Sequence, residues 1–122
     1  MKRIMVVDDE DMVRDVLKKA LTDRGYEVVL ASNGKKALEL FNSMGVDLVI
    51  TDILMPEKGG LSLITDLKKI NQDLKVIAIS GGGRDGKMDF LATASVIPGV
   101  STLHKPFHME SFFFTVQELL GE

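Results

Sequence analysis

The chain of 122 residues is predicted to form an α/β domain in which a parallel five-stranded sheet is covered by five helices. Short apolar runs rich in β-branched residues alternate along the chain with longer segments whose apolar residues recur at helical spacing. Two of these runs contain almost no polar residue, as expected for strands that are buried on both faces. Several runs end in an acid, a hydroxyl residue or glycines. The carboxyl ends of parallel strands are where such sheets bind ligands, so these ends are where function is expected.

The five expected strands differ in how apolar they are. The first and third are the most apolar and should be central neighbours, whereas the short, polar fifth belongs at an edge. The strand order 2-1-3-4-5 meets both conditions and gives a flavodoxin-like, doubly wound sheet with right-handed crossovers. The expected strands are Ile4–Val7, Glu27–Ala31, Leu48–Thr51, Lys75–Ser80 and Ser101–His104.

Each expected helix has one apolar face, and most are bounded by recognisable end signals. The first should close at Arg24–Gly25, and the second should begin after an Asn33 cap and end at Gly45. Flexible glycine loops, Gly59–Gly60 and Gly81–Gly83, should precede the third and fourth helices. The residues expected to face inward are Val13, Val16, Leu17, Ala20 and Leu21; Ala37, Leu38, Phe41 and Met44; Leu63, Ile64, Leu67 and Ile70; Met88, Leu91 and Ala92; and Phe112, Val116, Leu119 and Leu120.

Composition excludes several classes of protein. Hydrophobic residues make up 45% and charged residues 27% of the chain, which is ordinary for a single globular domain. The formal net charge of −3 provides no basic surface for nucleic acid, and the lack of cysteine excludes disulfides and thiolate metal sites. No apolar stretch is long enough to span a membrane or to act as a signal peptide. We therefore expect a cytoplasmic protein without direct contact to membrane or nucleic acid.

Polar residues at the strand ends should converge on one crevice. In the expected order the first and third strands lie side by side, so Asp8, Asp9 and Asp52 line the crevice, while Ser80 and Lys105 end the strands beyond it. Three carboxylates cannot all stay ionised there without a counter-charge, and hard oxygen ligands suit Mg²⁺. A metal, an aspartate, a lysine and a hydroxyl are what phosphoryl transfer to aspartate requires.

The chain resembles, over its whole length, the receiver domains of bacterial two-component response regulators. The resemblance implies that residues 1–122 are one receiver domain, a signalling switch rather than an enzyme, although it takes part in its own phosphorylation and dephosphorylation. The matching residues are Asp8–Asp9, Asp52 with Met55–Pro56 and Gly60, Ser80, and Lys105–Pro106–Phe107.

The same resemblance implies roles for individual residues. Asp52 would accept a phosphoryl group from the phosphohistidine of a sensor histidine kinase or a phosphotransfer protein. Asp9, Asp52 and the backbone carbonyl of Leu54 would bind Mg²⁺ directly, and Asp8 would act through water. Ser80 and Lys105 would hold the phosphoryl group.

The sequence departs from the family at Thr102, where many receivers carry a Tyr or Phe ring that moves inward on activation. The change on phosphorylation is therefore expected in the loop Ser80–Asp85 and the start of the fourth helix. The output surface would combine the fourth helix, the fifth strand and the last helix. Phe90 and one of Phe113 or Phe114 would anchor a downstream protein or a second copy of the chain. Thr102 also leaves open an alternative, a binding module that has kept the fold but signals without phosphate.

Other patterns are weaker. Gly81–Lys87 fits the spacings of two phosphate-binding loops, but Met88 stands where a Ser or Thr should bind Mg²⁺, and this is the fourth strand–helix turn rather than the first. A dehalogenase-like phosphatase needs a second aspartate where Leu54 stands. His104 and His108 are expected to be exposed polar residues. The chain continues little beyond the last helix, and two alternatives stay open: a whole single-domain regulator or a fragment of a longer one.

Overall fold

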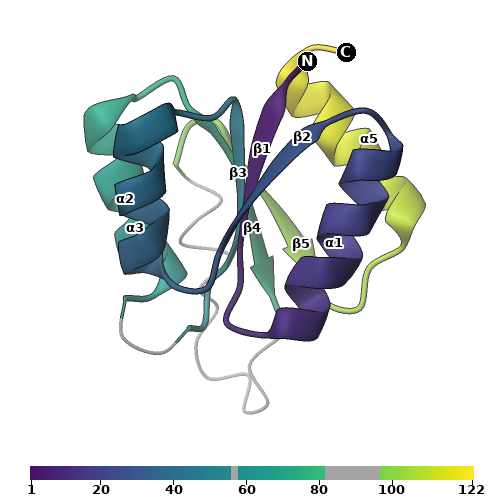
Figure 1. Ribbon diagram of the computed structural model, residues 1–122, viewed down its shortest axis with the longest axis horizontal. Coiled ribbons are helices and arrows are strands. Elements are labelled where there is room, and N and C mark those ends of the chain that lie inside the picture. Colours follow the sequence, from purple (N-terminus) through teal and green to yellow (C-terminus); the bar gives the residue numbers. More distant parts are fainter. Residues whose placement is uncertain (56–57, 82–96) are drawn as a thin grey trace.

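A computed structural model describes residues 1–55, 58–81 and 97–122 (Figure 1). Its five strands form one sheet in the order β2-β1-β3-β4-β5, and all four strand pairs are parallel, so the predicted topology is confirmed. Three boundaries differ by one residue from the expectation, because β1 and β5 begin one residue earlier and β3 includes Asp52. The strands are β1 (Arg3–Val7), β2 (Glu27–Ala31), β3 (Leu48–Asp52), β4 (Lys75–Ser80) and β5 (Val100–His104).

Four helices cover the sheet within the described part of the chain. Figure 1 shows α2 and α3 on one face of the sheet and α1 and α5 on the other. The expected fourth helix, with Phe90, lies within residues 82–96 and so outside the described residues, as does most of the loop Ser80–Asp85. No helix of the described segments is long and apolar enough to cross a membrane. The bounds are α1 (Asp11–Asp23), α2 (Gly34–Met44), α3 (Gly60–Ile70) and α5 (Met109–Leu120).

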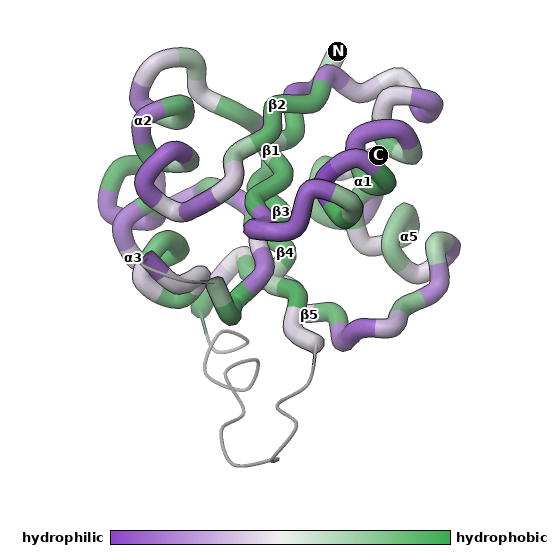
Figure 2. Tube along the Cα trace, turned by 60° about the horizontal axis from the view of Figure 1, so that its bottom comes forward, coloured by the Kyte–Doolittle hydropathy of each residue, from purple (hydrophilic) through white to green (hydrophobic). Residues whose placement is uncertain are grey.

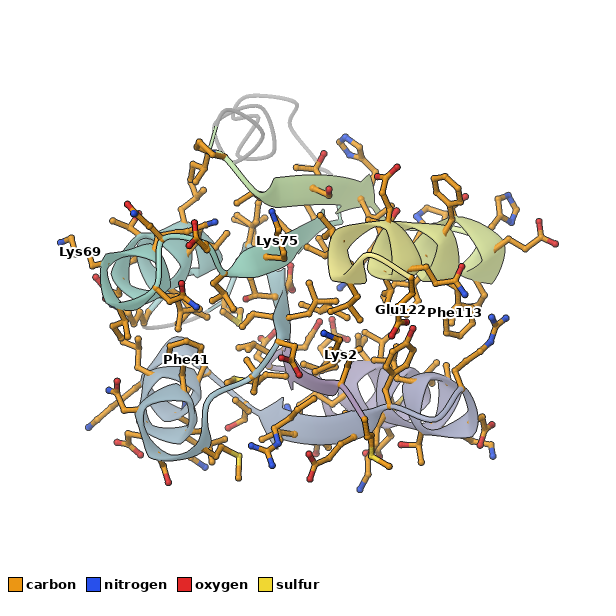
Figure 3. The ribbon with its side chains drawn as sticks, turned by 90° about the horizontal axis from the view of Figure 1, so that it is seen from above. Lys2, Phe41, Lys69, Lys75, Phe113 and Glu122 are labelled. Atoms are coloured by element: carbon orange, nitrogen blue, oxygen red, sulfur yellow. The ribbon has the colours of Figure 1, made fainter. Side chains whose placement is uncertain are left out.

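The sheet separates two hydrophobic cores. Side chains of a strand alternate between its faces, so Met5 and Val7 point to one core while Ile4 and Val6 point to the other. Figure 2 shows the apolar strands passing between the two helical layers, and Figure 3 shows Phe41 of α2 on the side that faces α3. The α2/α3 core includes Ala37, Phe41, Leu63, Ile64 and Leu67, and the α1/α5 core includes Leu17, Leu21, Phe112 and Val116.

The expected helix ends are present. The Asn33 side chain accepts a hydrogen bond of 2.9 Å from the backbone N–H of Lys36, which caps α2. Gly25 and Gly45 follow α1 and α2 with positive φ angles of 93° and 67°, a region that favours glycine. These local signals fix where the chain reverses and returns to the sheet.

Three residues that were expected to face inward are exposed instead. Val16, Met44 and Ile70 are 60%, 45% and 51% exposed. Met44 and Ile70 are the last residues of α2 and α3, beyond the last buried residue of each helix. Val16 lies beside the inward stripe formed by Leu17 and Leu21, on the flank of α1, where it borders a groove described below. The apolar stripe of α1 is therefore wider than the surface it packs on.

Candidate phosphoacceptor and metal site

The topology brings three of the expected site residues to the same edge of the sheet. In the register, Val7 of β1 lies beside Thr51 of β3, and Asp52 lies beside Ile79 of β4. Asp8, Asp52 and Ser80 therefore follow one another across the carboxyl ends of three adjacent strands. All three side chains are buried, although they are polar or charged.

Lys105 connects the two buried carboxylates. Its Nζ lies 3.5 Å from Oδ2 of Asp8 and 3.7 Å from Oδ2 of Asp52. Its backbone N–H donates a hydrogen bond of 2.7 Å to the carbonyl of Ser80, which ties the end of β4 to the residue that follows β5. One ammonium group thus faces two carboxylates, and the pocket keeps an excess of negative charge.

Burial dominates the electrostatics of both carboxyl groups. It raises the pKa of Asp8 and of Asp52 above the ordinary value of an aspartate, and the ammonium of Lys105 offsets part of each rise. Each pKa is also lowered by a backbone hydrogen bond, from Glu10 to Asp8 and from Leu54 to Asp52, while neighbouring negative charges raise it. A bound cation would relieve this unfavourable burial of charge.

A second group of acids lies beside Asp8. Carboxylate oxygens of Asp8, Asp9 and Glu10 lie within 4.8 Å of one another, with Asp9 and Glu10 exposed to solvent. Asp52 does not belong to this group. Asp8 is therefore the residue shared by the exposed acidic group and the buried pair of Asp8 and Asp52. Glu10 was not predicted to be a ligand. Its position as the third consecutive acid after Val7 is the pattern that could have indicated such a role.

The donors fit Mg²⁺. The described residues around the crevice offer carboxylate oxygens, with the backbone at Leu54 next to Asp52, and both histidines are exposed to solvent. Mg²⁺ accepts one or two carboxylates and retains several waters, which suits a site that is buried on one side and open on the other. The residual negative charge of Asp8 and Asp52 is the feature that a divalent cation would balance.

Gly60 has a different role from the flexible loop residue that was expected. It is the first residue of α3, and its N–H donates a hydrogen bond of 2.9 Å to the carbonyl of Ile53. A Cβ atom at this position would lie 2.4 Å from the carbonyl oxygen of Asp52 and 2.7 Å from Cα of Ile53. A glycine is needed because the start of α3 presses against the backbone that carries Asp52.

A groove that the sequence did not predict opens beside the crevice. It has a volume of about 620 Å³ and runs between α1 and the segment that follows β5. Met12 and Val16 on its rim are 80% and 60% exposed, so apolar side chains of the rim face solvent. The lining residues are Met12, Val13, Val16, Leu17, Gly81, Lys105, Pro106, Phe107 and Met109.

The pKa shift of Asp8 leads to a stability prediction for the metal-free protein. Because the pKa in the folded state is raised, the native state holds a proton that the unfolded state releases, and wild-type stability falls as pH rises from about 4 through the folded pKa. Asp8→Asn should therefore raise Tm at pH 7, by about 4 °C for each kcal/mol gained in unfolding free energy. The gain should shrink towards pH 4.

Thermal melts in EDTA between pH 4 and pH 8 measure this effect, with Asp15→Asn on the exposed face of α1 as the control for loss of a carboxylate. With Mg²⁺ added, wild type should gain more than Asp8→Asn. A gain that is equal at pH 4 and pH 7 would show that packing, not charge, had changed.

The fold and the acid–lysine–hydroxyl crevice define a class of Mg²⁺-compatible phosphoacceptor domains, and comparison with known proteins gives the family. A family model described as the response regulator receiver domain matches residues 4–117. The chain belongs to this family, whose members act as phosphorylation-dependent signalling switches in two-component systems.

Individual relatives agree with this assignment. The chemotaxis protein CheY of Thermotoga maritima is 35% identical over 112 residues, which cover 91% of this chain and 87% of that protein. The sensor kinase CckA of Brucella abortus (strain 2308) is 37% identical over 119 residues, but the matched region covers 96% of this chain and 12% of the kinase. The chain thus spans only a small part of some curated relatives.

Solved structures match the whole fold. The response regulator protein TrrA of Thermotoga maritima, crystallised in complex with Mg²⁺–BeF, superposes with a TM-score of 0.83 at 37% identity and covers 98% of this chain and 100% of that one. A second crystal structure holds TrrA in complex with the histidine kinase ThkA. Both complexes were formed by TrrA, and they show what that protein binds.

Proposed function

We propose that Asp52 is the phosphoacceptor of this receiver and that Asp8, Asp9, Asp52 and the carbonyl of Leu54 form its Mg²⁺ site. The observation that supports this most strongly is the position of Lys105 Nζ, at 3.5 Å from Asp8 and 3.7 Å from Asp52. A cation there is placed to meet a phosphoryl group on one carboxylate while the other carboxylate remains to hold a metal.

The chemistry follows from this arrangement. An oxygen of Asp52 forms the new O–P bond as the P–N bond of a phosphohistidine breaks, and the imidazole nitrogen keeps the electron pair and takes a proton from solvent. Burial raises the pKa of Asp52 in the metal-free protein, whereas Lys105 and a bound Mg²⁺ favour the ionised carboxylate that acts as the nucleophile. Lys105 and the Ser80 hydroxyl bind two of the phosphoryl oxygens. When bound, Mg²⁺ neutralises charge on the transferred group.

Loss of the phosphoryl group restores the site. A water attacks the phosphorus, the O–P bond to Asp52 breaks, and inorganic phosphate leaves. The domain thus takes part in its own phosphorylation and dephosphorylation without turning over a separate substrate. We place it in the cytoplasm, because a kinase that forms phosphohistidine from ATP delivers the group in the compartment that holds ATP.

The partner that donates the phosphoryl group should dock on the apolar groove. A donor histidine must come within bonding distance of Asp52, so the protein that carries it must cover the rim of the crevice. The adjoining rim is formed by Met12 and Val16 of α1 and by Met109, all exposed apolar side chains. This composition suits the apolar face of a sensor kinase or phosphotransfer helix.

The output side should be the edge formed by β5 and α5, together with the fourth helix. Phe114 on α5 is 65% exposed, whereas Phe113 packs under the guanidinium of Arg24, 3.8 Å from the ring centroid. Phe114 is therefore the anchor expected for a downstream protein or a second copy of the chain. Thr102 lies half-buried in β5 beside Ala78. Because this position carries no aromatic ring, we expect the loop Ser80–Asp85 to carry the structural change on phosphorylation.

A comparison of two phosphoryl donors tests this function. Acetyl phosphate with Mg²⁺ should add one phosphoryl group to wild type, detected by intact mass, and phosphorylated sensor kinase cores from the same genome, tried singly, should include an efficient donor. Val16→Asp should keep labelling by acetyl phosphate but slow transfer from that kinase about tenfold or more, because a charge enters the apolar rim. Ile70→Asp changes an apolar residue of comparable exposure on α3 and should leave both reactions unchanged.

Two results would contradict the proposal. Wild type that gains no mass from acetyl phosphate with Mg²⁺ would remove the phosphoacceptor function and favour the phosphate-independent module. Val16→Asp and Ile70→Asp variants that behave alike with the kinase would place the docking surface elsewhere.

A further inference from the structure

Arg14 holds the segment that carries the exposed acids. Its Nη1 donates a hydrogen bond of 2.6 Å to the backbone carbonyl of Asp8, and its Nη2 pairs with Oδ1 of Asp11. The guanidinium is largely buried, with the side chain only 14% exposed, so it occupies one defined position. It is the charged side chain of α1 that reaches back to the end of β1.

The carbonyl that Arg14 binds belongs to the peptide joining Asp8 to Asp9. The other side of this short segment is also held, because the N–H of Glu10 donates a bond of 2.9 Å to Oδ1 of Asp8 and the N–H of Arg14 donates one of 3.1 Å to the carbonyl of Glu10. Arg14 therefore fixes the peptide plane from which the Asp9 side chain projects. Asp9 itself is exposed to solvent.

We propose that Arg14 is a positioning residue for the Mg²⁺ site, which it preorganises by fixing the Asp8–Asp9 peptide. This inference rests on the metal site proposed above and extends it to a residue that touches neither metal nor phosphate. Groups that orient metal ligands in this way typically change metal affinity by about 10- to 100-fold when they are removed.

The positive charge of Arg14 makes the proposal testable, because loss of the charge and loss of the peptide anchor should change Mg²⁺ affinity in opposite directions. A cationic side chain next to a metal site repels Mg²⁺, so removal of the charge alone should tighten Mg²⁺ binding. Loss of the peptide anchor should weaken it. Arg14→Lys keeps the charge but lacks the planar fork that reaches Asp8 and Asp11 together, so it separates the two effects.

The experiment measures the Mg²⁺ dissociation constant by calorimetric titration of the full chain, and the rate of acetyl phosphate labelling at limiting and saturating Mg²⁺. Arg14→Lys and Arg14→Gln should both weaken Mg²⁺ binding about tenfold. Labelling should be slow at limiting Mg²⁺ and return close to the wild-type rate at saturation. Lys18→Gln, one turn further along α1 and exposed, is the control for loss of a positive charge and should bind Mg²⁺ at least as tightly as wild type does.

The outcomes are distinct. Arg14→Lys that binds like wild type, or Arg14→Gln that binds more tightly, would overturn the positioning role, and wild type that binds no Mg²⁺ would overturn the proposed metal site itself. If the Arg14 variants do not fold, Asp11→Asn decides the matter: it frees one end of the guanidinium and should weaken binding more than Asp15→Asn, which removes the same charge from the same helix. Equal effects of these two variants would refute the proposal.

Discussion

The Asp52→Asn variant should take up no phosphoryl group from acetyl phosphate under conditions in which wild type takes up one. An amide oxygen carries no negative charge and is a far weaker nucleophile than a carboxylate, so labelling should fall to background. The variant should fold, because the side chain keeps its shape and because the variant no longer buries a carboxylate charge, whose desolvation raises the pKa of Asp52 in wild type. Intact mass spectrometry after incubation with Mg²⁺ gives the result directly.

Asp47→Asn provides the matched control. Asp47 directly precedes β3, at the end of the strand opposite to Asp52, and is exposed. Its Oδ2 accepts a hydrogen bond of 2.8 Å from the backbone N–H of Arg3. This variant should be labelled like wild type. Labelling that persists in Asp52→Asn would move the acceptor to another group, and Asp8, the second buried carboxylate paired with Lys105, would be the first residue to examine.

Gly60→Ala should cost about 3 kcal/mol of unfolding free energy, a large effect for one methyl group. The new Cβ would meet the carbonyl oxygen of Asp52 at 2.4 Å and Cα of Ile53 at 2.7 Å. Both are backbone atoms, so relief requires α3 to move away from β3 rather than a side chain to rotate. The movement would also displace Asp52, and labelling of the folded fraction should slow.

The neighbouring glycine is the control. A Cβ atom on Gly59 would have its nearest contact at 3.5 Å, with the carbonyl of Ile53, and its φ of −72° is open to alanine. Gly59→Ala should therefore change the unfolding free energy by only about 0.5 kcal/mol, as measured by urea denaturation. Equal costs at the two positions would show that the close approach of α3 to Asp52 does not limit what residue 60 can be.

The sheet topology could be predicted from the sequence because burial leaves a strong imprint on parallel strands. Residues 4–7 and 48–51 are almost wholly apolar, which placed β1 and β3 at the centre, whereas the polar residues 101–104 placed β5 at an edge. Once the order is known, the meeting of Asp8 and Asp52 follows, since adjacent parallel strands end at the same edge. The meeting of these two residues therefore does not depend on side-chain conformations.

Details that depend on side-chain reach could not be predicted. The sequence placed Lys105 near the acids but could not show that its Nζ faces both Asp8 and Asp52, because a four-carbon stem has many rotamers. The bond from Arg14 to a main-chain carbonyl leaves no pattern in the sequence either. Gly60 was expected in a flexible loop, but its role is steric. Helical spacing alone could not show that Val16 borders a groove.

The separation of the two cores by the sheet has a consequence for how such a chain can diverge. Side chains on opposite faces of β1, β3 and β4 share a backbone but few contacts, so changes in the α1/α5 layer and in the α2/α3 layer should be close to additive. Paralogous copies can then vary the groove-bearing layer to choose new partners while the other layer keeps the scaffold unaltered. Partner recognition can therefore change in one helical layer while the other layer maintains stability. Chimeras that exchange one helical layer between relatives are a practical way to change the partner of such a domain.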